Sequence, residues 1–113
     1  MPEAPGPEDV KIITLARSAR ARVASAEGAA VRDETGRTYA AAAVALPSLQ
    51  LSALHLAVAM AASSGASVLE AAALVNDGGE PDSRDLTAVR ELGPGAVVFH
   101  AGLDGTVLAI LRP

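Results

Sequence analysis

The first quarter of the chain repeats its apolar positions with the period of an amphipathic α-helix. Pro7 stands where a helix can begin, because its missing N–H costs nothing in the first turn. Glu8 and Asp9 follow it, beside the positive end of the helix dipole. The pattern predicts a helix over residues 7–23, with its apolar face formed by Ile12, Leu15, Ala16, Ala19 and Val23.

The next apolar runs are separated by turn residues, as in a β-hairpin. The runs Gly28–Arg32 and Arg37–Leu46 flank a turn of sequence Asp-Glu-Thr-Gly. Pro47 and Ser48 then break the second strand and can start a helix. Because Leu49–Ser63 is apolar on almost every side, it predicts a helix that is buried over most of its surface.

The second half of the chain predicts three more strands and one short helix. A buried strand is expected over Ser67–Val75, followed by a polar loop that contains glycine. A helix that includes Leu86–Leu92 ends at Gly93, and strands follow over Ala96–Ala101 and Thr106–Leu111. The order α-β-β-α-β-α-β-β predicts an α/β fold, with a mixed five-stranded sheet and helices on its faces.

Length and composition limit both the architecture and the chemistry. A chain of 113 residues predicts one domain over residues 1–113, with residues 1–6 expected to be disordered. With 26 alanines and only two aromatic residues, the core must be aliphatic and its backbones closely packed. The absence of cysteine excludes disulfides, thiolate metal sites, iron–sulfur clusters and a cysteine nucleophile.

Charge and hydropathy exclude two classes of partner. A net charge of −4 and a pI near 5.0 argue against binding nucleic acid through bulk electrostatics. The most apolar stretch, Leu49–Ala62, is too short and interrupted for a bilayer, which takes about 20 residues. The N-terminus has no basic start followed by an apolar run, as a signal peptide would. We therefore expect a cytoplasmic protein with neither nucleic acid nor membrane as partner. Eight arginines against one lysine, with so much alanine, are typical of a GC-rich bacterial genome.

Several strings, in their order and spacing, resemble the cytidine deaminase family. Gly28–Val31 and the turn Glu34–Arg37 resemble the hairpin of that family. Pro81–Gly93 is similar to the family's Pro-Cys-x-x-Cys segment and the helix after it, and Ala101–Gly105 to its last strands. The resemblance runs from about Val10 to Pro113 and implies a three-layer α/β/α fold.

The same resemblance implies a zinc site, but the residues that would build it are missing. In zinc deaminases one helix supplies a His or Cys ligand and a second helix supplies two Cys, while a Glu moves protons. Here Ser52 stands at the first ligand position and Leu54 at the position of the glutamate. Asp82 and Asp85 stand at the two cysteine positions, and Ala41–Ala45 replace the sugar-binding motif. The sequence therefore predicts a catalytically inactive member without a cofactor, acting in binding, scaffolding or oligomerisation.

Two alternatives remain open for these positions. Carboxylates suit hard cations, so His55, Asp82 and Asp85 could form a rebuilt metal site of a deaminase or hydrolase. The simpler interpretation makes Asp82 the N-cap of a helix and Asp85 its third residue, where acids stabilise the helix end. A regulatory module that binds a nucleoside or nucleotide in the former pocket is the other alternative.

The apolar second helix also predicts self-association. A helix without a polar face must be covered, and a small domain gains most from such burial. We expect a homodimer or homotetramer, or a complex with another protein. The interface is expected to contain Leu51, Leu54, His55, Val58 and Met60.

Overall fold

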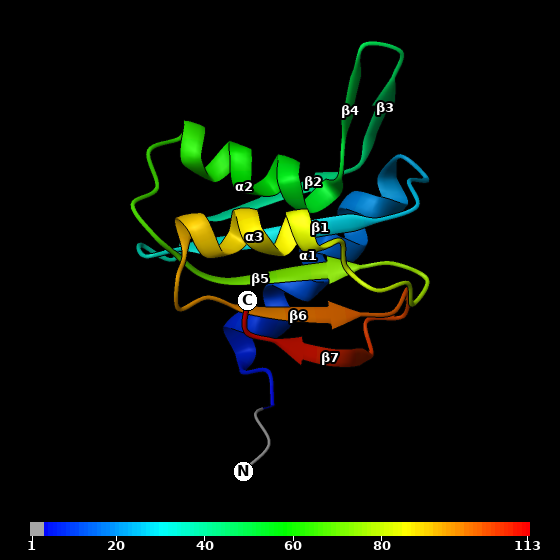
Figure 1. Cartoon of the computed structure of the whole chain (residues 1–113). Helices are drawn as coiled ribbons and strands as arrows, with labels where there is room; N and C mark the ends of the chain where they lie inside the picture. Colours follow the sequence, from blue (N-terminus) through cyan, green and yellow to red (C-terminus); the bar gives the residue numbers. More distant parts are fainter. Residues whose placement is uncertain (1–3) are drawn as a thin grey trace.

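The computed structural model describes residues 4–113, and its centre is a mixed five-stranded sheet (Figure 1). The strands lie in the order β2-β1-β5-β6-β7. Only β5 and β6 are parallel, whereas the other neighbouring pairs are antiparallel. The predicted fold class and mixed sheet are therefore confirmed. The strands are β1 (Gly28–Asp33), β2 (Thr38–Ala42), β5 (Leu69–Val75), β6 (Val97–Ala101) and β7 (Val107–Leu111).

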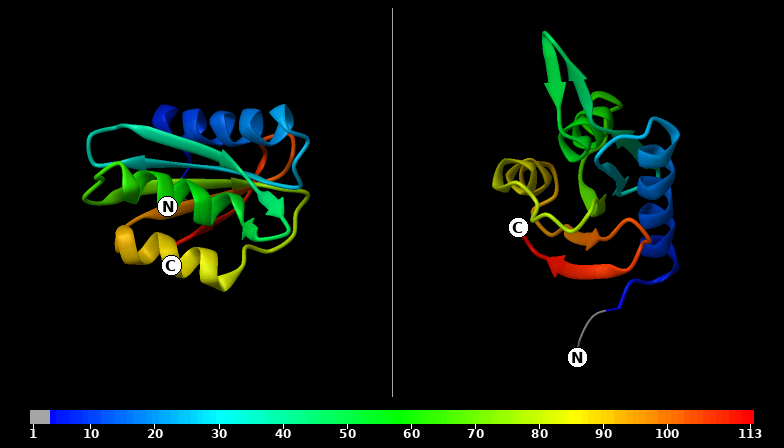
Figure 2. Two further views of the ribbon diagram at one scale, coloured as in Figure 1. Left: turned by 90° about the horizontal axis from the view of Figure 1, so that it is seen from above. Right: turned by 90° about the vertical axis from the view of Figure 1, so that its right-hand side faces the viewer.

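Three helices cover the two faces of this sheet (Figure 2). Helix α1 (Pro7–Arg22) lies on one face, whereas α2 (Ala53–Ser63) and α3 (Ser83–Leu92) lie on the other. Each side of the sheet has its own apolar core, one packed beneath α1 and the other beneath α2 and α3. The result is the three-layer α/β/α arrangement that the resemblance implied.

Small residues bring these layers close together. The buried β-strands are rich in alanine, and Ala71–Ala73 at the centre of β5 are fully buried. Gly28 at the start of β1 lies directly beneath α1, where any side chain would collide with the carbonyl oxygen of Ala16. The alanine excess therefore allows helices to pack directly on the sheet backbone.

The predicted helix over Leu49–Ser63 is wrong in its first turn. The structure forms a separate hairpin from β3 (Val44–Leu46) and β4 (Leu49–Leu51), joined at Pro47 and Ser48. Helix α2 begins only at Ala53, because the Ser52 side chain caps it by accepting a hydrogen bond from the His55 N–H. Short apolar runs fit strands and buried helices equally well, and the run 49–51 was misassigned for that reason.

The predicted strand Arg37–Leu46 is wrong in its second half, because β2 ends at Ala42 and residues 44–46 form β3 of the separate hairpin. The other predicted boundaries agree to within three residues, with α3 starting at Ser83 because Asp82 caps it. The prediction of disorder for residues 1–6 falls in part on residues 1–3, which lie outside the described residues. Gly6 is the N-cap of α1, and its N–H donates to Asp9 Oδ2 at 3.0 Å. Across residues 4–113, no helix is long and apolar enough to cross a membrane.

Candidate functional site

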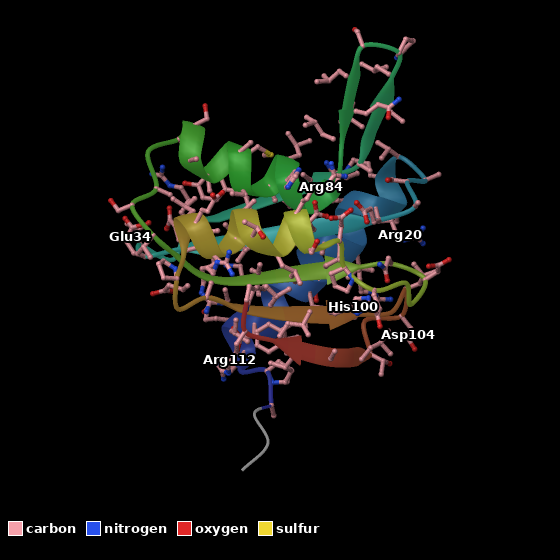
Figure 3. All side chains as sticks on the ribbon, viewed as in Figure 1. Arg20, Glu34, Arg84, His100, Asp104 and Arg112 are labelled. Carbon is pink, nitrogen blue, oxygen red and sulfur yellow. The ribbon has the colours of Figure 1, made fainter. Side chains whose placement is uncertain are left out.

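A cavity of about 330 Å³ lies where the N-terminal ends of α2 and α3 meet the carboxyl end of β5. Crevices beyond the carboxyl ends of strands are the usual ligand sites of open α/β sheets. Arg84 and His100 mark this end of the molecule in Figure 3. The cavity is bordered by polar side chains of Glu27, Gln50, Ser52, His55, Asn76, Glu80, Asp82, Arg84 and Asp85, with Leu74 and Pro81.

Ser52, His55 and Asp85 form one hydrogen-bonded network that joins α2 to α3. Ser52 Oγ donates to Asp85 Oδ1 at 2.9 Å while accepting from the His55 N–H at 3.1 Å. His55 Nε2 lies 3.3 Å from the same Asp85 oxygen and 3.1 Å from the carbonyl oxygen of Arg84. Both neighbours of Nε2 are acceptors, so Nε2 carries the proton and donates. Asp85, only 5% exposed, is therefore held by two partners from α2.

Asp82 is engaged in its own helix. Its Oδ1 accepts from the Arg84 N–H at 2.8 Å, and the Arg84 Nε lies 3.5 Å away. The backbone N–H and side chain of Arg84 hold the pKa of Asp82 below its ordinary value. Asp82 is the N-cap of α3 and Asp85 its third residue, as the helix-capping interpretation predicted.

Leu54 does not reach the cavity. Its side chain is fully buried in the core between α2 and the sheet, and it is absent from the cavity lining. At the position where the resemblance implies a proton-transferring glutamate, this chain therefore has a leucine that packs in the core. A leucine in this place has no group that could carry a proton.

The side chains of the site do not fit a zinc ion. Zinc in proteins is held mainly by cysteine and histidine, and here its three expected positions offer one hydroxyl and two carboxylates. The Ser52 hydroxyl and the Asp85 carboxylate bind each other, and Asp82 caps α3. Over the part of the chain that the structure describes, no three His, Asp or Glu side chains are placed to hold a metal. The side chains of the alternative set are engaged within the protein as well, because His55 contacts Asp85 and Asp82 caps α3.

Two polar residues at the cavity were not found from the sequence. Glu27 Oε1 accepts from the Ala53 N–H at 2.9 Å, so this carboxylate stands at the positive end of α2. Asn76 Oδ1 accepts from Nε2 of the buried His100 at 2.8 Å, and its amide donates to the Gly79 carbonyl oxygen. Glu27 lies 26 positions before its partner and no local pattern connects them. Asn76, by contrast, directly follows the predicted strand Ser67–Val75, and a polar residue at the end of a strand is a signal that the sequence itself contains.

The predicted interface residues divide between the core and the surface. Leu54 and Val58 face the sheet and are buried in the chain's own core, which corrects their assignment to an interface. Leu51 and His55 are half-buried, and Met60 is exposed. The inward face of α2 is therefore covered by the chain's own core.

The comparisons with known proteins agree with this architecture. The family model described as cytidine deaminase-like matches residues 5–105. The crystal structure of a cytidine deaminase from Burkholderia pseudomallei is 22% identical, with a TM-score of 0.77 and coverage of 90% of each chain. A cytidine deaminase structure from Mycobacterium leprae is 22% identical, with a TM-score of 0.67 over 89% of each chain.

A mutant cytidine deaminase from Mycobacterium tuberculosis is 25% identical, with a TM-score of 0.66 over 80% of this chain and 83% of that one. A comparison with curated proteins finds no match. The family match covers most of the chain, and the solved structures share its three-layer arrangement and mixed sheet. The chain therefore belongs to the cytidine deaminase-like family.

Proposed function

We propose that this protein is a catalytically inactive member of its family that acts by binding or scaffolding. The observation that carries the proposal is the network of Ser52, His55 and Asp85 across the place of the expected metal. Deamination by a zinc enzyme needs a metal-activated water and a group that exchanges protons with it. The side chains at these positions support neither requirement. Leu54 is buried in the core, and the Ser52 hydroxyl donates its hydrogen bond to the Asp85 carboxylate.

The test is a cytidine deamination assay on protein supplied with zinc. The absorbance change of cytidine should not exceed that of a protein-free control. Turnover, with bound metal that is lost in the Asp82→Ala/Asp85→Ala variant, would instead favour the rebuilt metal site. The matched control is Asp77→Ala/Glu91→Ala, which removes two exposed acids that do not line the cavity.

A second candidate function is regulatory binding of a nucleoside or nucleotide. It is favoured by the cavity of about 330 Å³ at the carboxyl end of β5, to which Gln50, Asn76 and Glu80 contribute polar groups. A ligand at a hundredfold excess over its Kd stabilises the folded protein by about 2.7 kcal/mol. A thermal-shift panel of nucleosides and nucleotides would detect that gain, and a panel without any shift would eliminate this candidate.

A further inference from the structure

A second cavity, of about 300 Å³, is bordered by residues of α3, β6, β7 and the loop before α3. Its mainly apolar lining consists of Glu80, Pro81, Leu86, His100, Ala109 and Leu111, and we call it the His100 cavity. The three positions at which zinc was expected do not border it. Small-molecule sites have this composition, with an apolar lining and few polar groups, and their volumes begin at about 300 Å³. What such a site would bind depends on its two polar side chains.

His100 supplies the cavity with a hydrogen-bond acceptor. The orientation of the Asn76 amide is fixed, because its nitrogen donates to the Gly79 carbonyl oxygen at 2.8 Å and its Oδ1 accepts from the Gly78 N–H at 2.9 Å. The same Oδ1 lies 2.8 Å from His100 Nε2, so Nε2 is the ring nitrogen that carries the proton. In the neutral ring, Nδ1 is then an acceptor.

This acceptor has no partner within residues 4–113. His100 is only 4% exposed, and its ring makes one hydrogen bond in the described part of the chain, through Nε2. No side-chain nitrogen or oxygen of the described residues is both enclosed and without a partner. The small open part of His100, which is labelled in Figure 3, therefore includes Nδ1. Because His100 lines the cavity, this nitrogen is available to a ligand there.

The other polar side chain of the cavity is also an acceptor. Glu80 is exposed, and its carboxylate makes no hydrogen bond or ion pair with any residue that the structure describes. Together with His100 Nδ1 it offers a ligand two side-chain acceptors, one of them negatively charged, and no free side-chain donor. A ligand that matches this lining donates hydrogen bonds, carries a positive charge and has an apolar body.

We propose that the His100 cavity binds a small primary amine with an apolar body. The ammonium group donates to His100 Nδ1 and pairs with the Glu80 carboxylate, while the body contacts the apolar side chains of Pro81, Leu86 and Leu111. An alcohol of the same shape would leave the charge of Glu80 unpaired. The inference goes beyond the proposed function, because it uses no residue of the network at the expected zinc positions, and neither zinc content nor deamination decides it.

The first test titrates the protein with three probes of nearly the same shape, benzylamine, benzyl alcohol and benzoate. NMR spectroscopy follows the ring nitrogens of His100 and the backbone amides of β6 and β7. We expect benzylamine to shift the Nδ1 resonance and to bind at least about fivefold more tightly than benzyl alcohol, and we expect no binding of benzoate. Equal affinity for the amine and the alcohol, binding of benzoate, or no binding of benzylamine at millimolar concentration would overturn the proposal.

Substitutions then separate the two polar contacts. Glu80→Gln should raise the dissociation constant of benzylamine about two- to fivefold, as expected for the loss of an exposed ion pair. Asp77→Asn is the matched control, because it removes the same charge from the same loop outside both cavities, and it should leave the constant unchanged. Equal effects of the two variants would show a general attraction to an acidic surface and would overturn the proposal.

Two further variants test the cavity itself. His100→Phe removes the acceptor and should raise the dissociation constant at least about tenfold. Ala109→Leu fills the cavity without removing a polar group, so it keeps the test decisive if His100→Phe does not fold. Ala109→Leu should abolish benzylamine binding while the protein still unfolds cooperatively in urea. A folded Ala109→Leu protein that binds benzylamine as tightly as wild type would place the probe elsewhere and overturn the proposal.

Discussion

Replacing Ser52 by alanine removes two hydrogen bonds that have different partners. The first is the N-cap of α2, in which Ser52 Oγ accepts from the His55 N–H at 3.1 Å. The second is the donation from Ser52 Oγ to Asp85 Oδ1 at 2.9 Å, which joins α2 to α3. Asp85 keeps His55 as a partner in the variant, 3.3 Å away.

The expected loss of unfolding free energy is about 2.5 kcal/mol. Loss of a serine N-cap costs about 1 kcal/mol. Loss of a hydrogen bond to a charged group costs about 1.5–3 kcal/mol, and the lower end applies because Asp85 keeps one partner. Asp82→Ala is the matched control, because it removes the cap of α3 and one exposed ion pair with Arg84, and it should cost about 1 kcal/mol.

Urea unfolding at one fixed protein concentration measures the unfolding free energy of both variants. If the dependence of this free energy on urea concentration is the same as in wild type, the comparison is valid. The double variant Ser52→Ala/Asp85→Ala completes a cycle that isolates the bond between the two residues. If Ser52→Ala costs no more than Asp82→Ala, or if the coupling is zero within about 0.5 kcal/mol, the network does not hold the two helices together.

Two further predictions concern the core and the response to acid. Leu54→Ala should lower the unfolding free energy by about 2–5 kcal/mol in the same urea assay, because Leu54 is fully buried; a cost below about 1 kcal/mol would show that it does not pack in the core. The Thr35 hydroxyl, with the Tyr39 hydroxyl and nearby backbone N–H groups, lowers the pKa of Asp33 from its ordinary 3.8. This contribution to stability is complete above the pKa of Asp33 in the unfolded chain, and it disappears as the pH falls through the pKa in the folded protein. As the pH is lowered below about 4, the urea midpoint should therefore fall more steeply in wild type than in Asp33→Asn. Parallel curves for the two proteins would contradict that assignment.

Local sequence signals predicted the features that neighbouring residues determine. Asp82 was identified as a cap because its partner, the Arg84 N–H, is two positions away. The order of strands and helices followed from turn residues such as those of the segment 33–36, which lie between apolar runs. These signals were sufficient for the mixed sheet and for its helices.

Features that depend on distant contacts were not predicted. Glu27 meets the N-terminal end of α2 only because β1 and α2 pack in three dimensions. The sequence does not show which side of α2 is buried, because alanines and leucines occur all around the helix. Leu54 and Val58 therefore cannot be distinguished from surface residues by their pattern alone. The sequence does not distinguish the hairpin strand Leu49–Leu51 from helix, because a three-residue apolar run has no distinguishing period.

The exposure of the uncharged residues 38–69 also depends on the fold. The absence of charge over residues 38–69 is visible in the sequence, but the sequence does not show which of these residues reach solvent. In the structure Leu46 and Met60 are exposed, whereas Leu54 and Val58 are buried.

The zinc content of the purified protein decides whether Ser52, Asp82 and Asp85 can hold a zinc ion. Wild-type protein and a Ser52→Cys/Asp82→Cys/Asp85→Cys variant are each equilibrated with zinc, desalted and measured by elemental analysis. Thiolates suit zinc at the three positions where the wild type has a hydroxyl and two carboxylates. We expect one zinc ion per chain in the variant and far less than one in the wild type. One zinc ion per chain in the wild type would contradict it.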